Sequence, residues 1–149
     1  MRGVYIHIPF CRNICSYCDF CKMYYNKELS NIYLDYLEKE IDMYYEGDTV
    51  KTIYVGGGTP SSLDTDNLNK LFRIINKFKI SSDAEFTFEC NIDDINDELL
   101  TILKENHVSR ISIGVESFNK DKLKYLNRNH NKKEIFNNIS LVKKYGFNK

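Results

Sequence analysis

Three cysteines fall within eight residues near the start of the chain, at Cys11, Cys15 and Cys18. They follow an apolar run, residues 4–10, whose first part predicts a strand buried on both faces. Thiolates spaced C-x3-C-x2-C on one short loop can bind a single metal centre. The identity of that centre decides what chemistry the chain can perform.

Several alternatives account for this spacing. Disulfides are disfavoured because five cysteines are present and no signal peptide is visible. A structural zinc site would take a fourth ligand from Cys21, His7 or Cys90, but a second pair with zinc spacing is missing downstream. An iron–sulfur cluster with three thiolate ligands leaves one of its four irons open to a ligand. The residues alone leave the zinc and iron–sulfur interpretations in competition.

The rest of the chain alternates between apolar strands and helical periodicity. Strands are predicted at residues 4–8, 52–55, 85–90 and 110–115. The helices predicted between and after them cover residues 30–44, 64–78, 96–103, 121–126 and 132–145, with Asp64 or Thr65 and Asn96 as caps and Gly146 at the last helix end. A strand followed by a helix four times over indicates an α/β fold with a parallel sheet. This order fits either a doubly wound sheet or a partial barrel.

Unusual polar or glycine residues follow every predicted strand. The cysteine loop follows the first, three glycines at residues 56–58 follow the second, Glu89 ends the third and Glu116 follows the fourth. Ligands of parallel α/β proteins bind at the carboxyl ends of the strands. We therefore expect one site at this edge of the sheet.

Each of these residues also has a structural explanation. The glycines could form only a tight turn, although three in a row also allow a ligand to approach the backbone closely. Glu89 at the end of a buried strand is suited to accept a pair of hydroxyls, such as those of a ribose. Tyr5 could be a packed core residue or a residue that contacts a ligand. We assign Cys21 and Cys90 to packing, with zinc closure through Cys21 as the alternative, and His7 to packing beside its strand.

The cysteine loop and its flanks resemble a known family. Tyr17 precedes the third cysteine, as in the radical S-adenosylmethionine (SAM) superfamily signature. The longer string over residues 5–11, continued by Asp19 and Phe20 after Cys18, is similar to the oxygen-independent coproporphyrinogen III oxidase group and most similar to its heme chaperone branch. The oxidases carry a further cysteine two residues after the third ligand, whereas Cys21 lies three residues after it.

This resemblance implies a fold and a set of cofactors. It favours an open (β/α) barrel, of which residues 1–149 would be the N-terminal portion of the radical SAM core domain, with four to five β/α units. Cys11, Cys15 and Cys18 would hold a 4Fe-4S cluster, and SAM would bind its open iron and be cleaved by one electron. The implied partners are a porphyrin or heme and an electron donor such as flavodoxin or ferredoxin. The resemblance leaves open whether the relative decarboxylates coproporphyrinogen III or delivers heme, and whether this chain is itself an active enzyme.

The resemblance also implies which residues surround the cofactors. They are Tyr5, Tyr17, Gly57, Gly58, Thr59, Glu89, Glu116 and Arg128. The glycine turn with its threonine would contact SAM, and Arg128 would bind its carboxylate. Ile92 stands where the family has a proline after its E-x-N string. Glu116 stands where the family usually has a glutamine, and an ionised glutamate would repel a carboxylate ligand.

Composition sets further bounds. The net charge of zero gives no electrostatic reason to expect a nucleic-acid or anionic-membrane partner. No apolar run approaches the roughly 20 residues needed to span a bilayer. With no visible targeting segment, the sequence predicts a cytoplasmic protein. Because the chain ends where a fifth strand would begin, we expect it to be a fragment of a longer protein.

Overall fold

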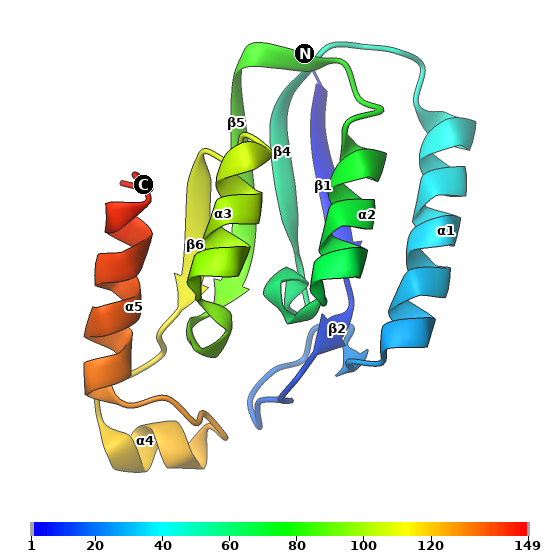
Figure 1. The fold of residues 1–149 in the computed structure, drawn as a ribbon. Helices are drawn as coiled ribbons and strands as arrows, with labels where there is room; N and C mark the ends of the chain where they lie inside the picture. Colours follow the sequence, from blue (N-terminus) through cyan, green and yellow to red (C-terminus); the bar gives the residue numbers. More distant parts are fainter. Residues whose placement is uncertain (1, 149) are drawn as a thin grey trace.

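The computed structural model describes residues 2–148 and contains a four-stranded parallel sheet. Its strands are β1 (Arg2–Ile8), β4 (Val50–Gly57), β5 (Ile80–Asn91) and β6 (Arg110–Gly114), in the order β1-β4-β5-β6. Within this sheet, strands that follow one another along the chain are therefore also neighbours in space (Figure 1). The chain winds in one direction without reversing.

Helices follow each of these strands. They are α1 (Lys27–Tyr44), α2 (Thr65–Ile75), α3 (Asp97–Glu105), α4 (Lys120–Tyr125) and α5 (Lys132–Lys144). Figure 1 shows α1, α2 and α3 side by side over the same face of the sheet. A doubly wound sheet carries helices on both faces and reverses its strand order. The observed arrangement confirms the alternative, a partial barrel with four β/α units.

Side-chain caps explain where the helices begin. Every α-helix has an Asn or Asp N-cap whose oxygen accepts a backbone N–H: Asn26, Asp64, Asn96, Asn119 and Asn131. The predicted caps Asp64 and Asn96 are confirmed. The first helix begins at Lys27, ahead of its apolar positions, because Asn26 caps it. Gly146 has a φ of 86° after α5, which confirms the predicted glycine end.

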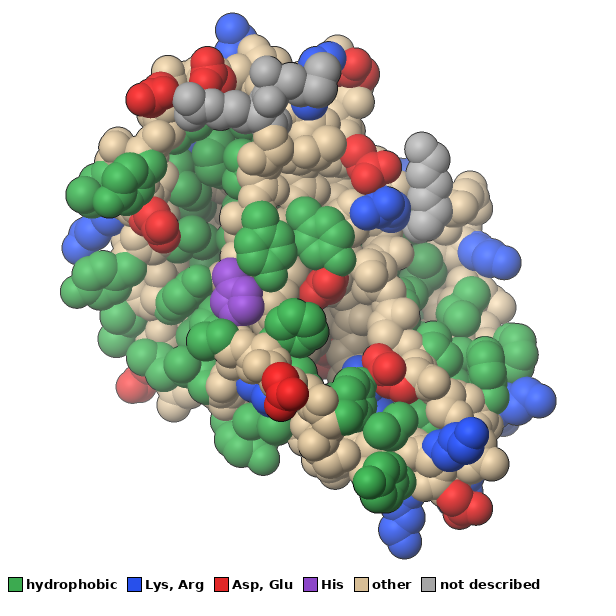
Figure 2. All heavy atoms as spheres, turned by 180° about the vertical axis from the view of Figure 1, so that it is seen from behind, with side chains coloured by type: hydrophobic (Ala, Val, Ile, Leu, Met, Phe, Trp, Pro, Cys, Tyr) green, Lys and Arg blue, Asp and Glu red, His purple; other side chains and the backbone are tan. Residues whose placement is uncertain are grey.

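The two faces of the sheet differ. Alternate strand residues such as Ile53 and Phe88 are fully buried under the helices. Tyr5 and Tyr54 point to the other face, and Tyr5 is 59% exposed. That face is turned toward the viewer in Figure 2, where aromatic side chains border a hollow. The prediction that residues 4–8 are buried on both faces is therefore wrong within the described part of the chain.

Short elements that the sequence did not predict fix the cysteine loop. β2 (Phe10–Cys11) pairs in parallel with β3 (Met23–Tyr24), so both ends of the loop are hydrogen bonded together. Two 3₁₀ turns, η1 (Pro60–Ser62) and η2 (Ile92–Asp94), follow β4 and β5.

Among the described helices, none has the length and apolar character that a membrane crossing requires.

Candidate functional site

A cavity of about 270 Å³ lies at the carboxyl ends of the four sheet strands. Except for Tyr5, all the predicted site residues line it: Cys11, Cys15, Tyr17, Cys18, Gly57, Gly58, Thr59, Glu89, Glu116 and Arg128. Tyr5 instead lines a second cavity between β1 and α1. The structure thus brings the four sequence motifs to one edge of the sheet, as expected.

The three cysteines of the motif differ in burial. Cys11 is buried at the end of β2, whereas Cys15 and Cys18 are partly exposed on the loop. The hydroxyl of Thr59 donates a hydrogen bond to Cys11 Sγ over 3.3 Å. Burial, and to a lesser degree the neighbouring thiols of Cys18 and Cys15, raise the pKa of Cys11. A bound cation would favour the thiolate that this site otherwise disfavours.

A single metal ion and a four-iron cluster require different arrangements of the thiols. Within residues 2–148, no three His, Cys, Asp or Glu side chains converge closely enough to hold one metal ion. A zinc ion needs its ligands around one point. The thiolates of a four-iron cluster each bind a different iron, so they surround a volume instead. The donor set and the shared cavity wall fit a cluster.

The other two cysteines are placed differently from the motif. Cys90 is buried in the core, as its assignment to packing predicts, and it also lines the cavity. Cys21 is exposed, so its assignment to packing is wrong. His7 is half-buried and hydrogen bonded at both ring nitrogens, to the hydroxyl of Tyr5 over 3.1 Å and to the carbonyl of Cys21 over 2.9 Å.

The glycine turn lies directly against the cysteine loop. Gly57 has a φ of 120°, a backbone angle that residues with a side chain rarely adopt. A Cβ atom on Gly58 would lie 2.9 Å from both Cys11 Sγ and the carbonyl carbon of Pro9. Both positions require glycine, and Gly57 and Gly58 line the cavity without a side chain that would obstruct a ligand. The turn therefore presents its backbone to the cavity.

Glu89 projects from the end of β5 toward the glycine turn. Its Oε1 accepts a hydrogen bond from the hydroxyl of Tyr54 over 2.5 Å, and its Oε2 accepts one from the Gly57 N–H over 3.3 Å. A carboxylate has about four acceptor positions, so capacity remains for a ligand in the cavity. Tyr54 was missed by sequence reasoning, although the alternation around it on β4 could have placed it on this face.

Arg128 occupies the far wall of the cavity. Its guanidinium donates to the side chains of Asn91 over 2.7 Å, Tyr17 over 3.0 Å and Glu116 over 3.2 Å. Its Nε is buried and has no hydrogen-bond partner. Glu116, which has a φ of 61°, folds its carboxylate onto this arginine. The result is a largely enclosed cation that already holds one carboxylate of the same chain.

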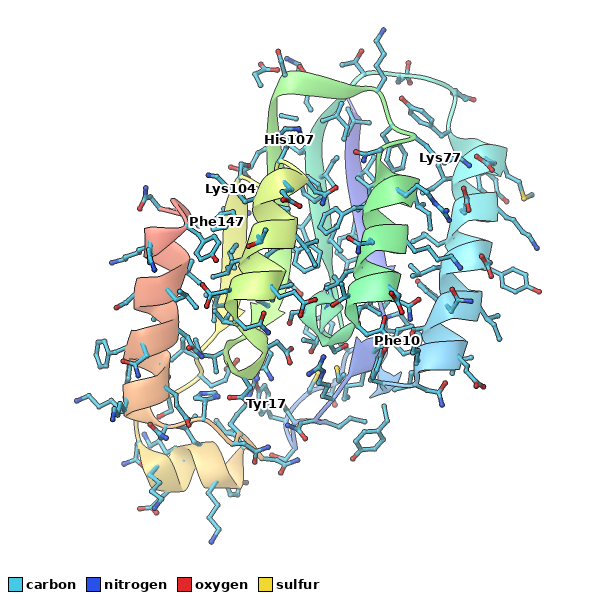
Figure 3. The ribbon with its side chains drawn as sticks, viewed as in Figure 1. Phe10, Tyr17, Lys77, Lys104, His107 and Phe147 are labelled. Atoms are coloured by element: carbon cyan, nitrogen blue, oxygen red, sulfur yellow. The ribbon has the colours of Figure 1, made fainter. Side chains whose placement is uncertain are left out.

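Tyr17 connects this wall to the cysteine loop. Burial raises its pKa to about 12, against the opposing effect of the neighbouring Arg128, so its phenol stays protonated at neutral pH. Figure 3 shows Tyr17 below the sheet, between the cysteine loop and the α4 side of the molecule.

The turn after α4 holds the same loop by its backbone. The side-chain amide of Asn127 donates to the Ile14 carbonyl over 2.8 Å, and the Ser16 hydroxyl donates to the carbonyl of Tyr125, the last residue of α4, over 3.0 Å.

Several cavity residues carried no earlier prediction: Arg12, Asn13, Phe20, Lys22, Asn91, Ser112, Ile113 and Gly114. Asn91 could have been found because it follows Glu89 at strand spacing and ends β5. Ser112 lies directly opposite Glu89 in the sheet. No local signal in the sequence indicates that pairing.

Comparison with known proteins identifies the class to which this fold and site belong. The radical SAM superfamily is matched over residues 5–149, and the chain is a member of that superfamily. A four-iron cluster and SAM are the cofactors that membership implies.

Within the superfamily, the chain is similar to heme chaperones and to coproporphyrinogen III oxidases. The chain is 43% identical to the heme chaperone HemW of Bacillus subtilis, over 99% of this chain and 40% of the relative. It is 38% identical to that of Lactococcus lactis, over 98% and 38%. The oxygen-independent coproporphyrinogen III oxidase of Escherichia coli is 31% identical, over 97% and 33%.

A solved structure agrees with the fold. The chain superimposes on coproporphyrinogen III oxidase (HemN) from Escherichia coli, described as a radical SAM enzyme, with a TM-score of 0.89 and 31% identity. The match covers 97% of this chain and 34% of that one. This chain therefore spans roughly two fifths or less of the length of these relatives.

Proposed function

We propose that the chain holds a 4Fe-4S cluster through Cys11, Cys15 and Cys18 and binds SAM beside it. The observation that carries the proposal is that these three thiols line one cavity together with the glycine turn, whose Gly58 lies against Cys11. The chain would be the N-terminal portion of a radical SAM core domain in a longer protein. When bound, the reduced cluster would supply the one electron that cleaves the sulfonium of SAM.

The remaining cavity residues would place SAM. Gly57, Gly58 and Thr59 offer open backbone next to the thiols, where the methionine amino group of SAM would bind. Glu89, held by Tyr54, would accept the ribose hydroxyls. Arg128 would bind the carboxylate, and its unpartnered Nε supports a missing anionic partner.

Tyr5 is placed differently from the other residues. It lies on the open face beside His7 and does not line the cavity. A contact with the cofactor or with a porphyrin would have to come from that face.

Within the superfamily we propose a role like that of the heme chaperones. Matches of 38% and 43% identity to heme chaperones support this choice over the oxidases at 31%. The cysteine after the motif, Cys21, is exposed and does not line the cavity, and it lies one residue later than the further cysteine of the oxidases. A heme or porphyrin ligand, an electron donor such as flavodoxin or ferredoxin, and a cytoplasmic location all belong to this proposal.

Anaerobic reconstitution with iron and sulfide tests the proposed cluster. We expect about four irons and four sulfides per chain with a broad visible absorbance. One tightly held zinc ion without colour would support the structural zinc alternative and overturn the proposal.

A further inference from the structure

An ionic contact anchors the cysteine loop at the residue that follows its first cysteine. Arg12 lies next to Cys11, and its Nε is 3.7 Å from Oδ1 of Asp94 in η2. The same Nε donates a hydrogen bond to the carbonyl of Ser62 in η1 over 3.2 Å. We propose that Arg12 and Asp94 form a bracket that positions the cysteine loop for the metal cluster, Arg12 and Asp94 both acting as positioning residues.

Asp94 is a buried carboxylate at the end of η2. Its side chain is only 5% exposed, and its Oδ2 accepts a hydrogen bond from the Ser61 hydroxyl over 2.7 Å. Ser61 in turn accepts the backbone N–H of Asn91 over 2.9 Å. The bracket therefore rests on the turns that follow both β4 and β5.

A buried carboxylate requires compensation. Taking a charge out of water is costly unless it is paired and hydrogen bonded. Within the described chain, Arg12 is the cation that forms an ion pair with Asp94, and the side chain of Arg12 is itself 53% exposed. The Arg12 end of the pair belongs to the cysteine loop, so the pair ties that loop to η2.

The bracket acts on the loop through its backbone. The carbonyl of Ser62 accepts the hydrogen bond from Arg12, and the hydroxyl of Ser62 donates to the Phe10 carbonyl over 3.0 Å. Thr59, which directly precedes η1, donates its hydroxyl to the thiol of Cys11. Loss of the Arg12 contacts would free the residues that lead to Cys15. The loop would then have to be ordered when the cluster binds, at a cost in conformational entropy.

Two measurements test the bracket. The first follows the anaerobic loss of the reconstituted cluster to an iron chelator, and it rests on the proposed function. We expect Arg12→Gln to lose the cluster about tenfold faster than wild type, a value reduced from that of a fully buried pair because Arg12 is half-exposed. Arg12→Lys keeps the charge and should restore most of the retention. The double variant Arg12→Gln with Asp94→Asn should lose the cluster more slowly than Arg12→Gln alone, since no unpaired carboxylate remains.

The second measurement needs no cluster. Amide hydrogen exchange over residues 12–22 of the reduced, cluster-free protein should be faster in Arg12→Gln than in wild type. The control is Arg110→Gln, which removes an exposed ion pair of 3.3 Å with Glu85 and a hydrogen bond to Thr87 at the other end of the sheet. If Arg12→Gln matches this control in both measurements, the bracket is overturned. If wild type takes up no cluster, the proposed function fails, and hydrogen exchange alone decides the bracket.

Discussion

The two ends of the four-stranded sheet carry their charged groups in different ways. At the amino end, Lys51 pairs with Asp83 over 2.9 Å and Arg110 with Glu85 over 3.3 Å, and at least 36% of each of these side chains is exposed. At the carboxyl end, the side chain of Arg128 is 13% exposed and that of Asp94 is 5% exposed. Both partners of each pair are thus solvated at the amino end, whereas at the carboxyl end one partner of each pair is enclosed and the other, Arg12 or Glu116, is more exposed.

This difference separates what maintains the fold from what builds the site. Exposed pairs contribute between about 0 and 1 kcal/mol each to stability. Buried polar groups cost stability unless they are fully satisfied, and Arg128 retains an unpartnered Nε. A protein keeps such groups where function requires them. Variants at the two ends should therefore affect different properties.

The largest effect is expected from the cysteines. Cys11→Ala, Cys15→Ala and Cys18→Ala should each lower the iron content of the reconstituted protein from about four per chain to fewer than one. Cys21→Ala is the matched control, because Cys21 follows the same loop but is exposed and outside the cavity. Iron and sulfide analysis checks the prediction, which fails if all four variants retain equal amounts of iron.

Glycine substitutions should separate the site from the rest of the chain. Gly58→Ala should lower the free energy of unfolding by about 1–3 kcal/mol and impair cluster uptake, because its Cβ would meet Cys11 and Pro9. Gly47→Ala, at a φ of 85° with no atom within 4 Å of the added Cβ, should cost about 1 kcal/mol of backbone strain and leave cluster uptake intact. Urea unfolding and iron analysis measure the two effects. Equal loss of iron in both variants would contradict a special role for Gly58.

Glu116 should weaken the binding of SAM by occupying Arg128. Glu116→Gln keeps an acceptor for the Arg128 Nη2 donor but removes the negative charge beside the proposed carboxylate site. We expect about fivefold tighter binding of SAM to the cluster-loaded protein, equivalent to about 1 kcal/mol. Titration of the visible spectrum with SAM measures it, with Glu85→Gln at the amino end as the control. Unchanged affinity would remove Glu116 from the cofactor site.

The smallest effect is expected at the amino end. Hydrogen bonds from Ser81 and Lys51 lower the pKa of Asp83 from 3.8 to about 2. Because the folded pKa is the lower one, this carboxylate stabilises the fold above pH 3.8, and the contribution is lost as the pH falls through about 2. Asp83→Asn should therefore be slightly less stable than wild type at pH 7, by an amount that shrinks in acid, with normal cluster uptake. A difference in unfolding that is independent of pH would contradict this assignment.

Much of this arrangement could be predicted from the sequence because the signals are local. The apolar strands, the caps Asp64 and Asn96 and the glycine after α5 depend on short-range periodicity and on backbone hydrogen bonds. The meeting of four motifs at one edge follows from parallel strands. The single face covered by helices α1 to α3 in Figure 1 follows from strand order, which repetition alone does not determine.

The remaining features depend on contacts between distant residues. The bracket joins Arg12 to Asp94, and Asn127 binds the backbone of Ile14, across separations that no local pattern encodes. The exposure of Tyr5 was missed because the sequence of an apolar strand with one exposed face resembles that of a strand buried on both faces. Cys21 was misassigned because its burial depends on the path of the loop that ends at β3.

The most direct test of the account is the electron paramagnetic resonance spectrum of the reduced, reconstituted protein with and without SAM. An iron left open by the three thiolates of Cys11, Cys15 and Cys18 should bind SAM, so adding SAM should change the spectrum of the wild type and equally that of Cys21→Ala. A spectrum that stays the same at saturating SAM, from a protein that contains about four irons, would contradict the claim that the open iron faces the glycine-lined cavity.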